Sequence, residues 1–320
     1  MMGLNNLINV SVVVASYNPN LDKLLKTINS IIIQQNITFQ IIITDDGSKN
    51  DYFFELEQFF NNIKFKNFIL IKNKINMGTV KNIKKALDIC DGTYTKLISP
   101  GDCLYDKYTL YRWVTFLKET NASFSFGNAV YYYMSENEVK FVRHKAWPQN
   151  TFVYKDTFID NSKIINNYLL FNDTIHGATL IGKTLIYKKY FEMGIDIIKY
   201  AEDCLYRLMV FDGVSIKFFP YNVIFYEYGS GISTRPDKKW QSILKKDIQA
   251  TDKIILELSK NNSFIRNFNL VITSRDNPLF LNKIKSYIFV HGLFIEKCKN
   301  KFFKRYTKVN IPDNLVSILK

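Results

Sequence analysis

The chain has 320 residues, 47% of them hydrophobic, and a formal net charge of +14. Its length suffices for one large domain or two smaller ones with a full core. Apolar runs such as 11–15 and 40–44 are strand-sized, and none approaches the roughly 20 residues of a membrane-spanning helix. We therefore expect a soluble or peripheral protein whose amino terminus forms a first strand and is not a secretory signal.

The first hundred residues alternate between strand and helix patterns. Apolar, β-branched runs predict strands over 10–15, 39–44, 67–72 and 94–98. Between them, apolar residues recur at helical spacing from Leu21, with Asn20 as a plausible N-cap, then in an aromatic stretch through Phe60 and again after Gly78. This rhythm predicts an α/β fold, a mostly parallel sheet with helices on both faces.

Beyond about residue 117 the alternation fades. We expect a hairpin over 129–144, a turn and strand over 175–187, a helix over 199–211 with two carboxylates in its first turn, and mainly helix from 238. Four cysteines are far apart and lack the spacing of a zinc site or a disulfide framework, so reduced thiols in a cytoplasm are expected. They are Cys90, Cys103, Cys204 and Cys298.

Polar turns follow three of the predicted strands, at 16–20, 45–51 and 99–102. The carboxyl ends of parallel strands share one edge of the sheet, and ligands of such sheets collect there. Asp45 or Asp46 can accept hydrogen bonds from a base or a ribose, although the sequence "DDGS" is equally an ordinary turn. Tyr17 can stack on a base or belong to the core.

The turn "SPGD" carries a single acidic residue. Asp102 suits a hard cation such as Mg²⁺ or Mn²⁺, which can take its remaining ligands from water and substrate phosphates. Gly101 lets the backbone approach a phosphate closely. The alternative is a turn that only closes the fourth strand.

Three further residues are candidates in the second half. Glu202 and Asp203 stand near a predicted helix start, where an ionised carboxylate is favoured and can serve as a general base. A capping or salt-bridging pair is the other explanation. His176 precedes Gly177 and an apolar strand, and is either a structural histidine or a ligand contact.

Several classes of site are excluded by missing motifs. No G-x-G-x-x-G follows the first strand, no Walker phosphate loop is present, and no G-x-S-x-G elbow occurs.

Four segments in order resemble the family 2 glycosyltransferases, whose fold is the GT-A nucleotide-sugar-binding domain. They are "VSVVVASYNPNLDKLLKTINSIIIQ", "IIITDDGSKND", "NMGTVKNIKKALDICDGTYTKLISPGD" and "YAEDCLYRLMVF", between about 10 and 211, and "EYGSGIS" at 227–233 resembles a further loop of one branch. The resemblance implies Asp203 as catalytic base with Glu202 second, and Asp45 or Asp46 on the base or ribose. It also implies nucleotide-sugar contacts from Ser16, Tyr17, Asn18, Asn76, Gly78, Asn82 and Gly101.

The metal motif of that family, D-x-D or D-x-D-D, is reduced here. Ser99 and Gly101 stand where acidic residues are common, which leaves Asp102 as the only expected metal ligand. This looks like the bacterial surface polysaccharide branch, in which a histidine precedes the acceptor-side strand as His176 does. The implied activity is inverting transfer from a nucleotide-diphosphate sugar, a UDP-sugar by family preference, to a hydroxyl of a glycan or lipid-linked acceptor, with Mn²⁺ or Mg²⁺.

By the same resemblance, residues 1–235 would form the GT-A domain, with a nucleotide-sugar half to about 118 and an acceptor half over 119–235. Residues 236–320 would form a helical, basic region. Two other functions stay open: a non-catalytic nucleotide-sugar or anionic-lipid binding module, and a sugar nucleotidyltransferase. The latter would need a Gly-rich, Arg-containing loop after the first strand, and "SYNPN" is not such a loop.

The positive charge concentrates at 283–308, which holds eight Lys or Arg against one Glu among apolar residues. This pattern fits a basic amphipathic segment on acidic lipid, or a helix that packs one apolar stripe on the core. A nucleic-acid partner is not expected, and AT-biased coding explains the overall charge equally well. The expected location is the cytoplasm or the inner face of the cell membrane.

Overall fold

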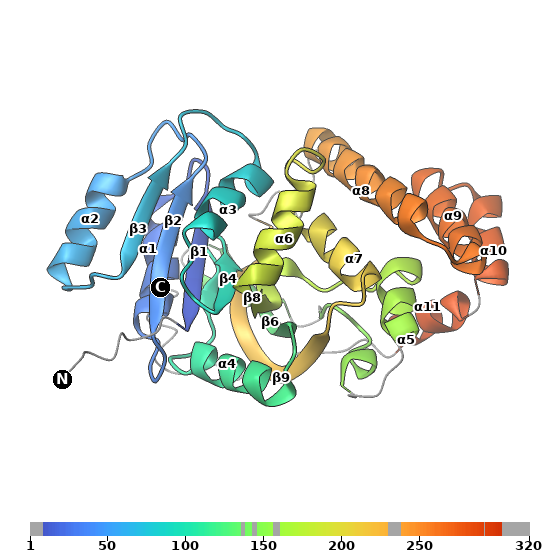
Figure 1. The fold of residues 1–320 in the computed structure, drawn as a ribbon, viewed down its shortest axis with the longest axis horizontal. Helices are drawn as coiled ribbons and strands as arrows, with labels where there is room; N and C mark the ends of the chain where they lie inside the picture. The colour runs from blue at the N-terminus through green and yellow to red at the C-terminus, as the bar shows by residue number, and fades with distance from the viewer. Residues whose placement is uncertain are drawn as a thin grey trace.

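The computed structural model describes residues 9–135, 138–142, 146–155, 161–229, 238–290 and 292–302. Within them one mixed sheet has the strand order β3-β2-β1-β4-β8-β6-β9-β5, with β7 paired to β6 (Figure 1). Its parallel part consists of β1 (Val10–Ser16), β2 (Phe39–Asp45), β3 (Phe68–Lys72) and β4 (Tyr94–Ile98). These are the four predicted strands.

Helices cover both faces of this sheet, as the strand and helix rhythm predicted. Apolar residues of α1 (Leu21–Ile32), α2 (Phe53–Asn62) and α4 (Thr109–Thr120) pack on one face, and those of α3 (Thr79–Asp88) and α6 (Thr184–Gly194) pack on the other. Asn20 caps α1 as expected, because its Oδ1 accepts a hydrogen bond of 3.0 Å from Lys23 N–H.

The second half extends the sheet with antiparallel and parallel strands. The predicted hairpin is present, since β6 (Phe124–Ser135) pairs antiparallel with β7 (Glu138–Phe141); residues 143–144 lie outside the described part. The long strand β9 (Ile216–Glu227) was not expected, and it pairs with β6 and with the short β5 (Cys103–Leu104).

One boundary of the sequence interpretation was wrong. The expected turn and strand over 175–187 consist of a 3₁₀ turn (Gly177–Thr179) and β8 (Leu180–Lys183), but the chain then enters α6 at Thr184. Within 184–187, Tyr187 belongs to the buried stripe of that helix and is fully buried, whereas Leu185 faces the solvent. A short apolar run does not distinguish a strand from a buried helix.

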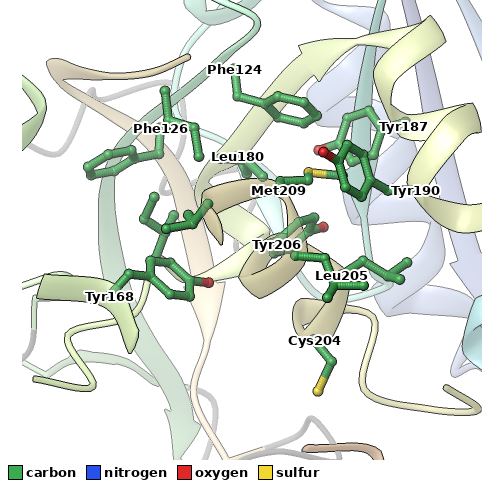
Figure 2. Packing of buried hydrophobic residues seen from close by; sticks show 14 of the residues in the cluster. Phe124, Phe126, Tyr168, Leu180, Tyr187, Tyr190, Cys204, Leu205, Tyr206 and Met209 are labelled. Carbon is green, nitrogen blue, oxygen red and sulfur yellow. The ribbon is translucent and has the colours of Figure 1, made fainter. Parts of the chain in front are cut away.

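The predicted helix after residue 199 is α7 (Asp203–Phe211), which is almost wholly buried beyond its first residue. Figure 2 shows Leu205, Tyr206 and Met209 of this helix packed among aromatic side chains of β6 and α6. This packing fixes the start of α7, and hence Asp203, against the sheet. All four cysteines are free thiols, as their spacing indicated.

The carboxyl-terminal part is helical, as expected, and lies at the end of the molecule away from β2 and β3 (Figure 1). It comprises α8 (Lys238–Leu258), α9 (Asn262–Asp276), α10 (Phe280–Phe289) and α11 (Leu293–Phe302). Asp252 of α8 is buried and pairs with Arg207 of α7 and with Arg275 of α9, so an ion network joins α8 and α9 to α7. The remaining short helical turns are 152–154, 161–165 and 166–170.

None of the helices in the described ranges has both the length and the apolarity required to cross a bilayer. The boundary placed at 235/236 between the two regions falls in the undescribed segment 230–237.

Candidate active site

The turns after β1, β2 and β4 lie at one edge of the sheet, because the strands are parallel and in register. Ser16 pairs with Asp45, and Val14 pairs with Ile98, so the three strands end at nearly the same level. The polar residues that follow them therefore face a common region, as the sequence predicted.

Both carboxylates of the "DDGS" turn accept hydrogen bonds from the protein. Asp45 is fully buried and accepts from Ser48 N–H at 2.7 Å and from the Ser48 hydroxyl at 2.5 Å. Asp46 accepts from Met77 N–H at 2.9 Å and from Gly78 N–H at 2.8 Å. Asp45 thus closes the turn after β2 on itself, and Asp46 ties that turn to the loop before α3, while each carboxylate keeps acceptor capacity beyond these bonds.

The turn after β1 presents an exposed ring at the same edge. The Tyr17 side chain is 52% exposed, which excludes the core alternative for this residue. Asn18 adopts a positive φ of 45° and donates its N–H to the Ser48 hydroxyl at 2.6 Å, so the turns after β1 and β2 are joined.

Two of the residues expected beside a donor have structural contacts. Asn82 is 2% exposed, and its Oδ1 accepts from the Thr44 hydroxyl at 2.6 Å and from Asn73 Nδ2 at 2.9 Å. Gly78 has a φ of 95°, and a Cβ there would lie 2.6 Å from the Lys199 carbonyl oxygen. Asn76, two residues earlier, is partly exposed.

Asp102 lies beside a second carboxylate that was not among the predicted site residues. Asp102 is 5% exposed, and its Oδ1 accepts from Glu227 N–H at 3.1 Å. Glu227 is the last residue of β9, is 7% exposed, and pairs through Oε1 with Lys23 Nζ at 2.5 Å. The end of β9 therefore adds a carboxylate to the turn after β4.

Gly101 is required for this arrangement. It has a φ of 103°, which L side chains rarely adopt, and a Cβ would occupy the position of Glu227 Oε2. Its N–H donates to Thr27 Oγ1 at 3.0 Å, and its carbonyl accepts from the Tyr132 hydroxyl at 2.5 Å. The turn that carries Asp102 is thus held from α1 and from β6, and it lies against the end of β9.

A buried lysine interacts electrostatically with Asp102. Lys96 of β4 is fully buried and donates from Nζ to the carbonyl oxygens of Leu97, at 2.8 Å, and Ala178, at 2.5 Å. Burial lowers the pKa of Lys96 to about 7, against the pull of Asp102. Burial also raises the pKa of Asp102 to about 7, although Glu227 N–H and Lys96 oppose the shift.

Asp203 lies against Gly177 of the 176–178 segment. Its Oδ1 is buried, accepts no hydrogen bond from any described residue, and occupies the space that a Cβ on Gly177 would need. Burial raises the pKa of Asp203 and, together with the neighbouring Asp203 charge, that of Glu202. Glu202 precedes the helix and makes no side-chain cap bond, so the capping explanation does not hold for it.

His176 belongs to the segment between Asp203 and the surroundings of Asp102. Its ring contacts the Tyr226 ring edge to face at 4.3 Å between centroids, and Tyr226 precedes Glu227. Burial and the nearby Lys96 lower the pKa of His176 to about 4, so the imidazole is neutral at pH 7. Residues 176–178 therefore contact the surroundings of Asp102 through Lys96 and Tyr226, and Asp203 through Gly177.

The loop before Asp203 is held from the carboxyl-terminal helices. Asp247 of α8 accepts from the N–H groups of Lys199, Tyr200 and Ala201, at 3.2, 2.8 and 2.9 Å. The Lys199 carbonyl in turn accepts from Val80 N–H at 3.2 Å, beside Gly78. One buried carboxylate of α8 thus connects the loop of Asp203 to the loop that Asp46 holds.

The comparison with family models is decisive. The model of Glycosyl transferase family 2 matches residues 11–191, which is more than half of the chain. The chain belongs to glycosyl transferase family 2. It is therefore a glycosyltransferase, and the family predicted from the four sequence segments is confirmed.

Solved structures similar to this glycosyltransferase include those of S. aureus TarS. The complex of TarS 1–349 with UDP-GlcNAc has a TM-score of 0.57 at 16% identity, over 97% of this chain and 84% of that chain. The UDP complex has a TM-score of 0.53 at 16% identity, over 90% and 75%. This likeness confirms the predicted GT-A fold with its helical carboxyl-terminal region, and the search of curated proteins gave no match.

The residues around Asp102 in this glycosyltransferase fit a hard divalent cation held jointly with a diphosphate. The Asp102 and Glu227 carboxylates are adjacent, and the missing Cβ of Gly101 leaves room for Glu227 Oε2. Mg²⁺ is commonly held by one or two carboxylates plus substrate phosphates. Across the described residues no group of three or more His, Cys, Asp or Glu could hold a metal ion without such help.

Proposed function

We propose that this glycosyltransferase moves a sugar from a UDP-sugar to a hydroxyl of a glycan or lipid-linked acceptor, with inversion, in the synthesis of a bacterial surface polysaccharide. The observation that carries the proposal is the unpartnered buried Oδ1 of Asp203, which lies against Gly177 in the same 176–178 segment whose Ala178 carbonyl accepts from Lys96. This supports a proton acceptor at Asp203 and a diphosphate-binding group at Asp102 that act in one site.

The donor would bind over the turns after β1 and β2. The exposed Tyr17 ring offers a face on which a uracil can stack, and Ser16, Asn18, Asp45 and Asp46 would supply hydrogen-bonding groups around it. The TarS structures contain UDP and UDP-GlcNAc, which supports uridine as the base. Gly78 and Asn76, joined to this turn through Asp46, would border the sugar diphosphate.

Asp102 and Glu227 would hold Mn²⁺ or Mg²⁺ at the diphosphate. When bound, the cation would offset the negative charge that develops on the departing diphosphate. Lys23 pairs with Glu227 Oε1 and is 40% exposed, so it adds a positive charge at the same place.

The transfer step needs a base toward the acceptor. The acceptor hydroxyl would give its proton to Asp203 while its oxygen forms the bond to the anomeric carbon, and the bond from that carbon to the diphosphate oxygen breaks. UDP leaves with the bonding electron pair. Burial raises the pKa of Asp203, and a raised pKa makes a carboxylate a better proton acceptor near neutral pH. Glu202 is the second candidate, and His176 is a candidate contact for the acceptor.

The test is a panel of nucleotide sugars with the purified full chain, with and without Mn²⁺. A bound donor stabilises the native state and raises the Tm by mass action. We expect one UDP-sugar to raise the Tm and to release UDP. The variant Asp203→Asn should keep the Tm rise and lose UDP release, whereas the control Asp196→Asn, at a side chain 82% exposed, should keep both.

Three other results of this test would contradict parts of the proposal. No Tm rise with any nucleotide sugar would reject the donor site. A Tm rise without UDP release by the wild-type chain, with water or any glycan offered as acceptor, would favour a non-catalytic binding module. Normal UDP release by Asp203→Asn would remove Asp203 from the mechanism.

A further inference from the structure

Helix α10 faces the solvent with its apolar side. Phe280, Leu281 and Ile288 are 77, 67 and 67% exposed, whereas Ser286 is 2% exposed. At 100° per residue the three apolar side chains, with Ile284 between them, fall within one stripe of the helix, and Ser286 lies on the opposite side. A surface helix of a globular protein normally has the reverse arrangement, so the core does not account for this stripe.

The exposed apolar surface continues beyond α10. Leu279 before the helix is 61% exposed, and Phe294 and Ile295 of α11 are 57 and 56% exposed. The Tyr287 and Phe294 rings lie 5.9 Å apart, which joins the two helices on one side. In Figure 1 α10 lies at the outer end of the molecule, farthest from the parallel strands. We call this surface, formed by residues 279–290 and 292–295, the α10 face.

The charged side chains of the α10 face are all positive. Its sequence contains no Asp or Glu between Asn277 and Ile295, and Lys283 and Lys285 of α10 are exposed beside the apolar stripe. Lys299 of α11 is exposed as well. A second copy of the chain would bring like charges together on this face, whereas an anionic lipid surface offers both negative charge and an apolar interior.

We propose that the α10 face is a membrane-docking surface on which α10 lies in the plane of an anionic bilayer. Phe280, Leu281 and Ile288 would enter the boundary between headgroups and acyl chains, and Lys283 and Lys285 would contact lipid phosphates. Such binding would hold the enzyme beside a lipid-linked acceptor. It concerns α10 and α11 alone and holds or fails separately from the donor and acceptor proposed above.

The experiment is co-sedimentation of the full chain with vesicles of phosphatidylcholine alone and of phosphatidylcholine mixed with phosphatidylglycerol. We expect binding to the mixed vesicles only, and weaker binding as salt is added, because exposed charges are screened. The double variant Phe280→Ser/Ile288→Ser should lower the partition coefficient at least tenfold. The double variant Lys283→Glu/Lys285→Glu should abolish the preference for phosphatidylglycerol.

The matched control is Phe152→Ser/Leu185→Ser, which removes two side chains that are 74 and 77% exposed outside the α10 face. It should leave binding unchanged. All variants should keep the wild-type Tm and release of UDP, because the changed side chains are on the surface. The proposal would be overturned if the wild-type protein did not bind anionic vesicles, or if the control variant lost as much vesicle binding as Phe280→Ser/Ile288→Ser. It would also be overturned if the chain formed a concentration-dependent dimer that Phe280→Ser/Ile288→Ser abolished.

Discussion

Gly177→Ala tests the role of Asp203 without changing the carboxylate itself. The φ of Gly177 is not in the left-handed region, so alanine is compatible with the backbone. The new methyl group would collide with Asp203 Oδ1 and would also approach Tyr206 Cε2 to 3.2 Å. Asp203 begins α7 and has a partly exposed side chain, so its carboxylate can move aside.

The magnitude follows from the displacement. Non-bonded heavy atoms pack best at roughly 3.5 Å or more, so the carboxylate would have to move by about 1 Å. A shift of about 1 Å in a positioned reacting group costs on the order of 100-fold in rate. The folding cost should stay within about 1–2 kcal/mol, because the tip of a side chain yields rather than the backbone.

The assay is UDP release with the donor and acceptor that the wild-type enzyme uses, together with the Tm. We expect kcat to fall about 100-fold while the KM for the donor and the Tm change little. The control Gly92→Ala introduces a methyl group against the backbone nitrogen of Ser11, near the start of β1 and away from Asp203, and should lower the Tm while kcat is retained. Wild-type kcat in Gly177→Ala would show that the Asp203 carboxylate does not act from its observed position.

Three further outcomes are expected. Asp102→Asn keeps an oxygen that accepts from Glu227 N–H but removes the negative charge. In this variant the Tm with UDP and Mn²⁺ should be no higher than the Tm with UDP alone, and a Tm increase by Mn²⁺ equal to that of the wild type would reject the metal site. His176 has a folded pKa of about 4, below the ordinary 6.5, so the unfolded chain takes up the proton first as the pH falls. By itself this shift lowers the free energy of unfolding by about 2 kcal/mol between pH 7 and pH 5, while the raised pKa values of Asp102, Glu202 and Asp203 act in the opposite direction. In chemical denaturation the free energy of unfolding of the wild type minus that of His176→Asn should therefore fall by about 2 kcal/mol over this range, and a constant difference would reject the shift. Asp247→Asn should lower kcat while the donor KM stays constant, whereas equal changes in both would indicate general loosening of the fold.

The parallel half of the fold could be predicted because its signals are local. Runs of β-branched residues identify strands that are buried on both faces, and Asn20 marks the start of α1 through a bond within one turn. The order of polar turns then places Asp45 and Asp102 at a common edge without knowledge of any side-chain contact.

The residues that complete the site could not be found in this way. Lys96 is in the middle of a predicted strand. It is buried near Asp102 only because helices and loops cover both faces of the sheet, which the sequence of that strand does not reveal. Glu227 ends a strand that was not expected, and its approach to Asp102 depends on the pairing of β9 with β5 and β6. The available signal was an acidic residue directly after the apolar run "VIFY", which matches the pattern that identified Asp45.

Asp247 shows why the carboxyl-terminal helices belong in any account of catalysis by this enzyme. The three N–H groups at 199–201 precede a helix start and would otherwise lack partners within the loop, and a buried N–H without an acceptor is costly. A single carboxylate from α8 accepts all three, and the Arg207 to Asp252 pair fixes α8 against α7 one turn farther on. The position of Asp203 is therefore set from both of its sides, by Gly177 in the sheet domain and by Asp247 in the helical region. A truncation before α8 should accordingly lose transfer even if the parallel sheet still binds UDP.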